Sequence, residues 1–248
     1  MVTRRLERLR GGQKYFSILA LDHGLTIGHG EGVPTYPFTD VMNACANQVM
    51  GVVFNYGMAR SYSELPNNMS LVLQCFGAPL RQRRVQITTV HHAIKMDAAA
   101  VAVQINLADP DLPSQTREIS SFTVEAHSVG MPVLYMVSGI HQGDAAEVAR
   151  SIRICHEMGA DIIKVTCSPT VLLPPNSELS QELLYSPPVL IAGGPLTEDL
   201  RNLATNAKRV GFSGYCVGRH IFQSSQPRNV VAMLHEIFNT NQLEIGDI

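Results

Sequence analysis

Short apolar runs alternate along the whole chain with stretches that have helical periodicity. Eight such runs predict strands, near residues 15–22, 51–56, 71–76, 99–106, 132–138, 160–166, 188–193 and 213–217. Helical patterns fall between them, near residues 38–49, 57–64, 88–96, 114–129, 143–158, 170–184, 197–208 and 227–238. Because nearly continuous apolar strands are buried on both faces, the pattern indicates a parallel sheet covered by helices.

Eight strand–helix units in 248 residues are typical of one closed (β/α)8 barrel, a TIM barrel of the α/β class. A doubly wound open sheet is the alternative, but no GxGxxG motif follows the first strand. We expect a single domain over residues 1–248, with an N-terminal helix or arm at 1–14 and a polar C-terminal tail at 239–248. Leu6 and Leu9 share one side of the Arg-rich start, which favours a short amphipathic helix over a transit peptide.

Composition excludes several classes of protein. Charged residues make up 16% of the chain and hydrophobic residues 45%, which excludes a disordered protein. A net charge of −2 offers no basic field for nucleic acid, and no apolar run approaches the ~20 residues of a membrane span. Five scattered cysteines without a CxxC pair are typical of the reducing cytoplasm. The low charge content favours a homo-oligomer, in which other subunits cover part of the surface.

Polar residues interrupt several strands near their C-terminal ends, which is where barrel enzymes carry their chemistry. Alternate strand residues point into a barrel, so these side chains are expected to outline a polar pocket at its mouth. They are Asp22, Asn55, Gln74, Gln104, Asn106, Lys164 and Thr166. Each of them, taken alone, is equally consistent with a satisfied buried polar group.

Lys164 is the sharpest single signal, because it lies inside the apolar run IIKVT and is one of only four lysines. Lysine is almost never fully buried without a partner. Burial favours the neutral amine of a lysine, and this amine can add to a carbonyl to form a Schiff base. The protonated imine then accepts electrons when an adjacent C–C bond breaks or forms. The alternative is a structural ion pair, for instance with Asp22.

Asp22 lies in LALDHG at the end of the first strand, where a carboxylate can orient the lysine or transfer protons. His23 opens the Gly-rich segment DHGLTIGHGEG, which can approach a ligand closely. A histidine in such a segment is more often a hydrogen-bonded loop residue than a catalyst. No cluster of His, Cys or carboxylate residues has metal-ligand spacing, so we expect neither a metal nor another cofactor.

Two glycine-containing turns follow the last two strands and indicate a phosphate site. Gly193 and Gly194 come after the seventh strand, and Gly218 and Arg219 come after the eighth. Glycines let backbone N–H groups reach an anion, and barrel enzymes frequently bind phosphate at these two loops. The alternative is that the glycines only allow tight turns.

A basic segment at residues 77–88 follows the third strand and contains Arg81, Arg83 and Arg84. It lies on the face of the barrel where loops carry chemistry, so it is either an anion site or a solvated irregular loop.

Four segments, in this order, resemble the DeoC/FbaB group of Schiff-base aldolases: LALDHGLTIG, GADIIKVT, PVLIAGGPLT and GYCVGRHIFQ. The group includes archaeal-type class I fructose-1,6-bisphosphate aldolases, 2-amino-3,7-dideoxy-D-threo-hept-6-ulosonate synthases and the thiolase that processes phosphorylated autoinducer-2. The resemblance spans about residues 4 to 236. It implies a TIM barrel in which Lys164 is the Schiff-base lysine, Asp22 is the catalytic aspartate and the two glycine turns bind phosphate.

The chain departs from this group after the fifth strand. Many members carry an acid/base tyrosine in a YPRG segment, but here the segment is PVLYMVSGIHQG, with Ser138 at the place of the tyrosine. Tyr135 would reach the site only if the strand were shifted, and His141 is the third candidate for proton transfer. Gln104 stands where relatives often carry histidine, and Leu196 stands where a lysine often follows GGP.

The sequence therefore predicts a class I aldolase that forms a lysine Schiff base with a small phosphorylated ketose or keto compound. The catalytic candidates are Lys164, Asp22, Ser138, Tyr135 and His141. The candidates for substrate binding are Gly193, Gly194, Gly218, Arg219, His23, Gln104 and Thr166. The first alternative is a heptulosonate-synthase-like transaldolase or an autoinducer-2-type thiolase, and the second is a non-catalytic barrel that binds a phosphometabolite.

Overall fold

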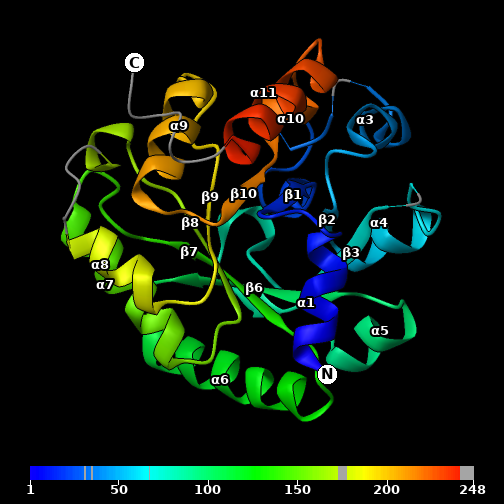
Figure 1. The fold of residues 1–248 in the computed structure, drawn as a ribbon. Coiled ribbons are helices and arrows are strands. Elements are labelled where there is room, and N and C mark those ends of the chain that lie inside the picture. The colour runs from blue at the N-terminus through cyan, green and yellow to red at the C-terminus, as the bar shows by residue number, and fades with distance from the viewer. Residues whose placement is uncertain (31, 35, 67, 173–177, 241–248) are drawn as a thin grey trace.

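A computed structural model describes residues 1–240 except 31, 35, 67 and 173–177, and its centre is a closed barrel of eight parallel strands (Figure 1). The strands are β1 Phe16–Ala20, β2 Gly51–Phe54, β3 Ser70–Gln74, β6 Ala100–Asn106, β7 Val133–Ser138, β8 Ile162–Val165, β9 Val189–Ile191 and β10 Gly214–Val217. The barrel closes because β1 pairs with both β2 and β10. The predicted (β/α)8 fold is confirmed, and every barrel strand overlaps a predicted run.

Helices surround the barrel (Figure 1). They are α3 Phe38–Cys45, α4 Tyr56–Ser61, α5 Val90–Lys95, α6 Leu112–Ser128, α7 Ala145–Glu157, α8 Glu178–Tyr185, α9 Leu200–Val210 and α11 Pro227–Asn239. Two short helices, α2 His23–Ile27 and α10 Arg219–Phe222, begin directly beyond β1 and β10. No helix in the described part of the chain is long and apolar enough to cross a membrane.

Two expected elements are only partly within the described residues. The helix expected at 170–184 is a 3-10 turn, η2 Pro169–Leu172, followed by α8, and residues 173–177 lie outside the description. The polar tail was expected at 239–248. Residue 239 is still part of α11, and residues 241–248 lie outside the described residues.

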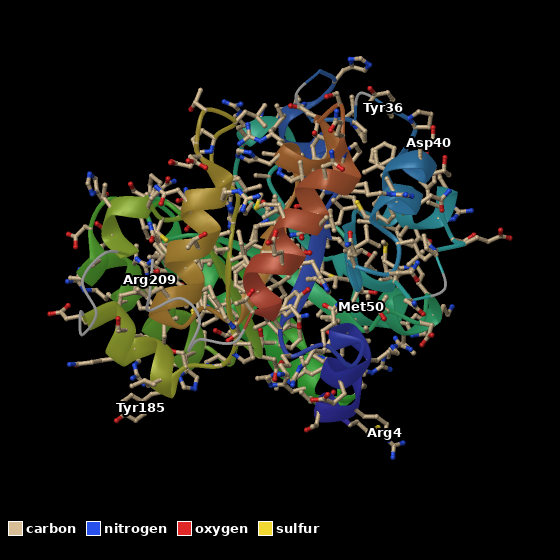
Figure 2. All side chains as sticks on the ribbon, turned by 45° about the horizontal axis from the view of Figure 1, so that its top comes forward. Arg4, Tyr36, Asp40, Met50, Tyr185 and Arg209 are labelled. Carbon is tan, nitrogen blue, oxygen red and sulfur yellow. The ribbon has the colours of Figure 1, made fainter. Side chains whose placement is uncertain are left out.

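The N-terminal helix α1, Val2–Arg10, covers the bottom of the barrel, as the amphipathic pattern predicts. Leu9 is fully buried and belongs to the apolar cluster inside the barrel. A Cβ at Gly51 would lie 2.7 Å from a methyl group of Leu9, so a glycine on β2 makes room for this contact. Arg8 forms a salt bridge with Asp97 at 2.9 Å, and Arg4 points away from the barrel (Figure 2).

The strand residues contribute to two separate apolar clusters, one inside the barrel and one between the barrel and the helices. On β8, Ile162 belongs to the inner cluster, whereas Ile163 and Val165 belong to the outer one. Lys164 has the parity of Ile162, and therefore faces the barrel interior near the C-terminal end of its strand.

The basic segment at 77–88 is not the irregular loop that the sequence suggested. β4 Phe76–Gly77 pairs antiparallel with β5 Val85–Gln86, and the 3-10 turn η1 Pro79–Arg81 lies between them. Two-residue strands are too short to show alternation, so the sequence pattern could not reveal this β4–β5 hairpin.

Several large apolar side chains are exposed on the outer helices. Leu184 and Tyr185 on α8 are 79% and 73% exposed, and Tyr185 projects from the edge of the molecule (Figure 2). The homo-oligomer expected from the low charge content stays a prediction.

Candidate active site

Two adjoining cavities lie at the C-terminal ends of the strands, and Lys164, Thr166 and His23 line both of them. The first, of about 250 Å³, extends over the loops that follow β9 and β10, and we call it the phosphate-loop cavity. The second, of about 200 Å³, extends over the ends of β1, β6 and β7, and we call it the Asp22 cavity. A larger groove of about 900 Å³ lies beside α1 at the other end of the barrel and contains none of the predicted site residues.

Lys164 is only partly exposed and stands above the inner apolar cluster. In the strand register it is level with Met136 on β7 and Leu190 on β9. Cys216 on β10 is buried beside it, where burial raises the pKa of the thiol and a hydrogen bond with Lys164 partly opposes that change. The amine therefore lies above the apolar side chains of the inner cluster and between the two cavities.

Asp22 follows β1 and is 5% exposed. One carboxylate oxygen, Oδ2, accepts a hydrogen bond from Gln104 Nε2 at 3.2 Å. The backbone carbonyl of Asp22 accepts another from Asn55 Nδ2 at 2.9 Å, which fixes the main chain. The second carboxylate oxygen, Oδ1, is buried with no hydrogen-bond partner among the described residues and lies 3.6 Å from His23 Nδ1. Asp22 is therefore held by one oxygen and retains acceptor capacity on the other.

His23 carries a largely buried imidazole that packs edge-on against the ring of Phe222, with 5.4 Å between the ring centroids. Burial lowers its pKa most; Lys164 and Arg219 lower it further, whereas Asp22 raises it. The imidazole is consequently neutral at neutral pH. A neutral imidazole has one N–H donor and one acceptor nitrogen, so it can pass a proton to or from Asp22.

The phosphate-loop cavity is built where the loops after β9 and β10 meet. Arg219 donates a hydrogen bond to the carbonyl of Gly194 at 3.4 Å, and His220 Nε2 lies 2.8 Å from the carbonyl of Pro195. Gly194 has φ +68°, a conformation that side chains rarely adopt. A Cβ at Gly193 would lie 3.0 Å from the His220 ring, so a side chain there would press on His220, whereas at Gly194 the backbone conformation itself favours glycine.

Ser138, His141 and Tyr135 were the candidates for the proton-transfer role of the missing tyrosine, and the structure places them differently. Ser138 lines the Asp22 cavity, but its Oγ donates to the carbonyl of Ile105 at 3.2 Å and accepts from Arg84 Nη2 at 2.8 Å. The only hydroxyl proton of Ser138 is thus engaged with the main chain. His141 is exposed and lines neither cavity.

Tyr135 is outside the site, which corrects its place among the catalytic candidates. Its strand is not shifted, because Met136 is level with both Gln104 and Lys164. The Tyr135 side chain therefore points to the helix layer, where its hydroxyl lies 2.8 Å from Thr123 Oγ1 and donates to the carbonyl of Met158 at 3.1 Å.

Three other polar strand-end residues also serve the structure. Asn55 holds the main chain at Asp22, and Gln74 donates to the carbonyl of Phe76. Asn106 accepts from the backbone N–H of Ala108 at 3.3 Å. Parity places these side chains correctly on the inner face, but it cannot reveal that each one turns to a nearby backbone group.

Arg84, in contrast, is a site residue that sequence reasoning did not single out. It was one of three arginines in the basic segment, and it alone of the three lines the Asp22 cavity. Together the two cavities contain three cationic side chains, Arg84, Lys164 and Arg219, and one carboxylate, Asp22. This excess of positive charge suits an anionic ligand. No group of three His, Cys, Asp or Glu side chains that could hold a metal occurs among the described residues.

Curated relatives carry related names. The chain is 26% identical over 247 residues to a 2-amino-3,7-dideoxy-D-threo-hept-6-ulosonate synthase of Halobacterium salinarum, which covers 95% of this chain and 90% of that protein. It is 24% identical over 241 residues to a 2-amino-4,5-dihydroxy-6-oxo-7-(phosphonooxy)heptanoate synthase of Streptomyces griseus, with coverage of 90% and 85%.

Solved structures of archaeal fructose-1,6-bisphosphate aldolases have the same fold. One superposes with a TM-score of 0.83 at 22% identity, covering 96% of this chain and 99% of that one. A second, with its catalytic lysine covalently bound to the carbinolamine intermediate of the substrate, gives 0.82 at 21% identity, covering 97% and 100%. The family model described as DeoC/LacD family aldolase matches residues 16–224, which includes every barrel strand and both cavities. The resemblance drawn from the four sequence motifs is thereby confirmed, and the chain belongs to the DeoC/LacD family of aldolases.

Proposed function

We propose that this protein is a Schiff-base aldolase in which Lys164 forms an imine with a small phosphorylated ketose or keto compound. One observation carries the proposal: a partly buried lysine lies between a cavity suited to phosphate and a cavity that contains a buried carboxylate. A carbonyl at Lys164 would have its phosphate end on one side and its reacting C–C bond on the other.

The reaction begins when the Lys164 ammonium group gives a proton to Asp22 and the resulting amine attacks the substrate carbonyl carbon to form a carbinolamine. Asp22 returns this proton to the carbinolamine oxygen, which leaves as water and yields an iminium ion. The bond between the α and β carbons then breaks, and its electrons move into the iminium to form an enamine. The β-hydroxyl gives up its proton to a base and the fragment leaves as an aldehyde. Protonation and hydrolysis of the enamine release the second product and the free lysine.

Asp22 is the group best placed to act as that base. Its Oδ1 is buried without a partner among the described residues, whereas Ser138 has its proton engaged and Tyr135 faces the helices. Gln104 holds the other oxygen of the carboxylate at 3.2 Å, which restricts its rotation. The neutral His23 next to it relays the proton. General acid–base catalysis of this kind contributes about 10²- to 10⁴-fold to a rate.

The phosphate group binds at Gly193, Gly194, Gly218 and Arg219, and Thr166 and Gln142 also line this cavity. This contact brings the carbonyl carbon to the amine, and such positioning accelerates a reaction by replacing a chance encounter with a fixed geometry. Leu196 is 46% exposed and supplies no charge, so Arg219 is the cationic side chain of this cavity besides Lys164.

Transfer of the enamine to a second aldehyde is the main alternative to simple cleavage, and the curated relatives named as heptulosonate and heptanoate synthases favour it. Both reactions use the same imine on Lys164. A product assay with and without an added aldehyde separates a lyase from a transaldolase.

Reductive trapping tests the imine. The protein is incubated with dihydroxyacetone phosphate or fructose 1,6-bisphosphate, borohydride is added, and the adduct is located by peptide mass. The chain has only four lysines, so the assignment is unambiguous. We expect the adduct on Lys164, its loss together with all turnover in Lys164→Met, and neither loss in the control Lys95→Met, which changes an exposed lysine.

An adduct on another lysine, or turnover that persists in Lys164→Met, would contradict the proposal. If neither compound is trapped, a wider panel of keto phosphates decides whether another carbonyl compound is the substrate. Phosphometabolite binding that is equal in wild type and Lys164→Met, without turnover by either protein, would favour a barrel that binds such compounds without catalysis.

A further inference from the structure

Arg84 occupies an unusual place for an arginine in an exposed hairpin. Its neighbours point outward: Arg83 forms surface salt bridges with Asp111 at 3.0 Å and Glu118 at 3.4 Å, and Val85 is 40% exposed. Arg84 instead lines the Asp22 cavity and is only partly exposed. The β4–β5 hairpin therefore delivers one positive charge to the mouth of the barrel.

One nitrogen of the Arg84 guanidinium has a hydrogen-bond partner, and another is buried without one among the described residues. Nη2 donates to Ser138 Oγ at 2.8 Å, and Ser138 is itself fixed by its bond to the carbonyl of Ile105. Nε is buried with no hydrogen-bond partner among the described residues, and no carboxylate of the described chain lies within salt-bridge distance. Burial lowers the pKa of Arg84 and the more distant Asp109 raises it. A buried donor without a partner is costly, so this arrangement favours an anionic ligand.

The order of strands around the barrel shows which part of a substrate would meet Arg84. From β8 the phosphate-loop cavity extends in one direction, over β9 and β10, and the Asp22 cavity extends in the other, over β7 and β6. A substrate with its phosphate in the first cavity and its carbonyl at Lys164 must therefore place its other end in the second.

The size and lining of the Asp22 cavity restrict this other end. Its volume of about 200 Å³ leaves room for a small fragment with one anionic group. Asp22, Gln104 and Ser138 are polar members of its wall, and Arg84 is its cationic member besides Lys164.

We propose that Arg84 binds a second anionic group, a carboxylate or a phosphate, on the aldehyde fragment that leaves or adds at Lys164. This inference rests on the proposed Schiff-base function and assigns to Arg84 of the β4–β5 hairpin the choice between charged and uncharged aldehydes. A guanidinium donates two parallel hydrogen bonds to either oxyanion, so both sources share the same recognition chemistry.

The test compares Arg84→Gln with wild type and with the matched control Arg83→Gln from the same hairpin. Addition of the donor that traps on Lys164 is measured with three aldehydes: glyceraldehyde 3-phosphate, succinic semialdehyde and uncharged glyceraldehyde. In Arg84→Gln we expect kcat/KM to fall about 10- to 100-fold for one or both anionic aldehydes, since charge-assisted bonds are lost. With glyceraldehyde kcat/KM falls by a smaller factor, so the preference for a charged aldehyde is lost, while the donor still forms its borohydride adduct on Lys164. All rates in Arg83→Gln equal those of wild type.

The two anionic aldehydes distinguish a phosphate from a carboxylate as the natural group. An equal loss for charged and uncharged aldehydes, or no loss in Arg84→Gln, would overturn the proposal. If wild type forms no adduct with any donor, the Schiff-base function is refuted independently of Arg84. A binding experiment then tests the role of Arg84. Calorimetric titration of Lys164→Met with inorganic phosphate and with succinate should then show, besides the site at the loops after β9 and β10, an anion site that is absent from the double variant Lys164→Met/Arg84→Gln. A site count unaffected by the second substitution would refute the inference.

Discussion

Gly218→Ala offers a direct test of how closely the turn after β10 is packed against His23 and β1. A Cβ at this position would lie 2.4 Å from His23 Cε1 and 2.5 Å from the carbonyl oxygen of Ala20. Both distances are well below ordinary van der Waals contact. The Ala20 oxygen belongs to β1 and cannot withdraw, and the His23 ring is packed against Phe222. The methyl group therefore displaces either His23 or the loop that carries Arg219.

The magnitude follows from the overpacking of a fitted site, which costs about 1–3 kcal/mol in the free energy of unfolding. Alanine stabilises a protein through the unfolded chain only where it fits the native conformation without strain, so this gain does not offset the cost at Gly218. For a chain of this size each kcal/mol lowers Tm by about 2–4 °C, so we expect a decrease of about 2–12 °C.

Thermal unfolding of Gly218→Ala and the control Gly57→Ala measures this effect. Gly57 is in α4 with nothing within 4 Å of an added Cβ, so alanine there leaves stability unchanged or raises it by up to about 1 kcal/mol. The KM for the phosphorylated donor should rise in Gly218→Ala alone, since the loop and His23 can no longer adopt their present contact. A Gly218→Ala protein with wild-type Tm and wild-type KM would refute the argument that this glycine is required by close approach.

Two further predictions concern single side chains. Tyr135→Phe removes the hydroxyl contacts with Thr123 and Met158, so unfolding in urea should show a loss of about 1 kcal/mol, whereas kcat stays at the wild-type value; a large decrease in kcat would return Tyr135 to the catalytic machinery. Burial lowers the pKa of His23 below 6.5, so the unfolded chain binds more protons than the folded one as the pH falls below about 6.5. Urea unfolding at pH 7.5 and 5.5 should therefore show a smaller loss of stability on acidification for His23→Gln than for wild type, and an equal loss in both proteins would contradict this assignment.

The barrel could be predicted because the signal for it is repeated eight times. Each strand is buried on both faces, so its apolar run is continuous and easily located. The same runs set the parity of the polar residues within them, and this parity places Asp22, Gln104, Lys164 and Thr166 around two adjoining cavities. Alternation of side chains along a strand is a local property, so it survives without knowledge of the neighbouring strands.

Interactions between distant segments could not be predicted in this way. Asn55 and Gln74 have the same inward parity as the site residues, but they turn to carbonyl groups of Asp22 and Phe76. Arg84 lies 54 positions before Ser138, and no periodic pattern connects the two. The hairpin that joins them contains strands of two residues each, too short for a hydrophobic pattern.

The Arg84–Ser138 contact also offers a physical reason why this chain departs from the tyrosine expected of its relatives. An aromatic ring at position 138 would compete for the space in which Arg84 now approaches Ser138 Oγ at 2.8 Å. A serine is short enough to leave that space and polar enough to hold the guanidinium. In the mechanism proposed above, Asp22 and His23 take over proton transfer from the absent tyrosine, and Arg84 brings a positive charge to the barrel mouth. Because Lys164 and Arg219 also lower the pKa of His23, an anionic substrate that offsets this charge should raise it again and help the imidazole accept a proton.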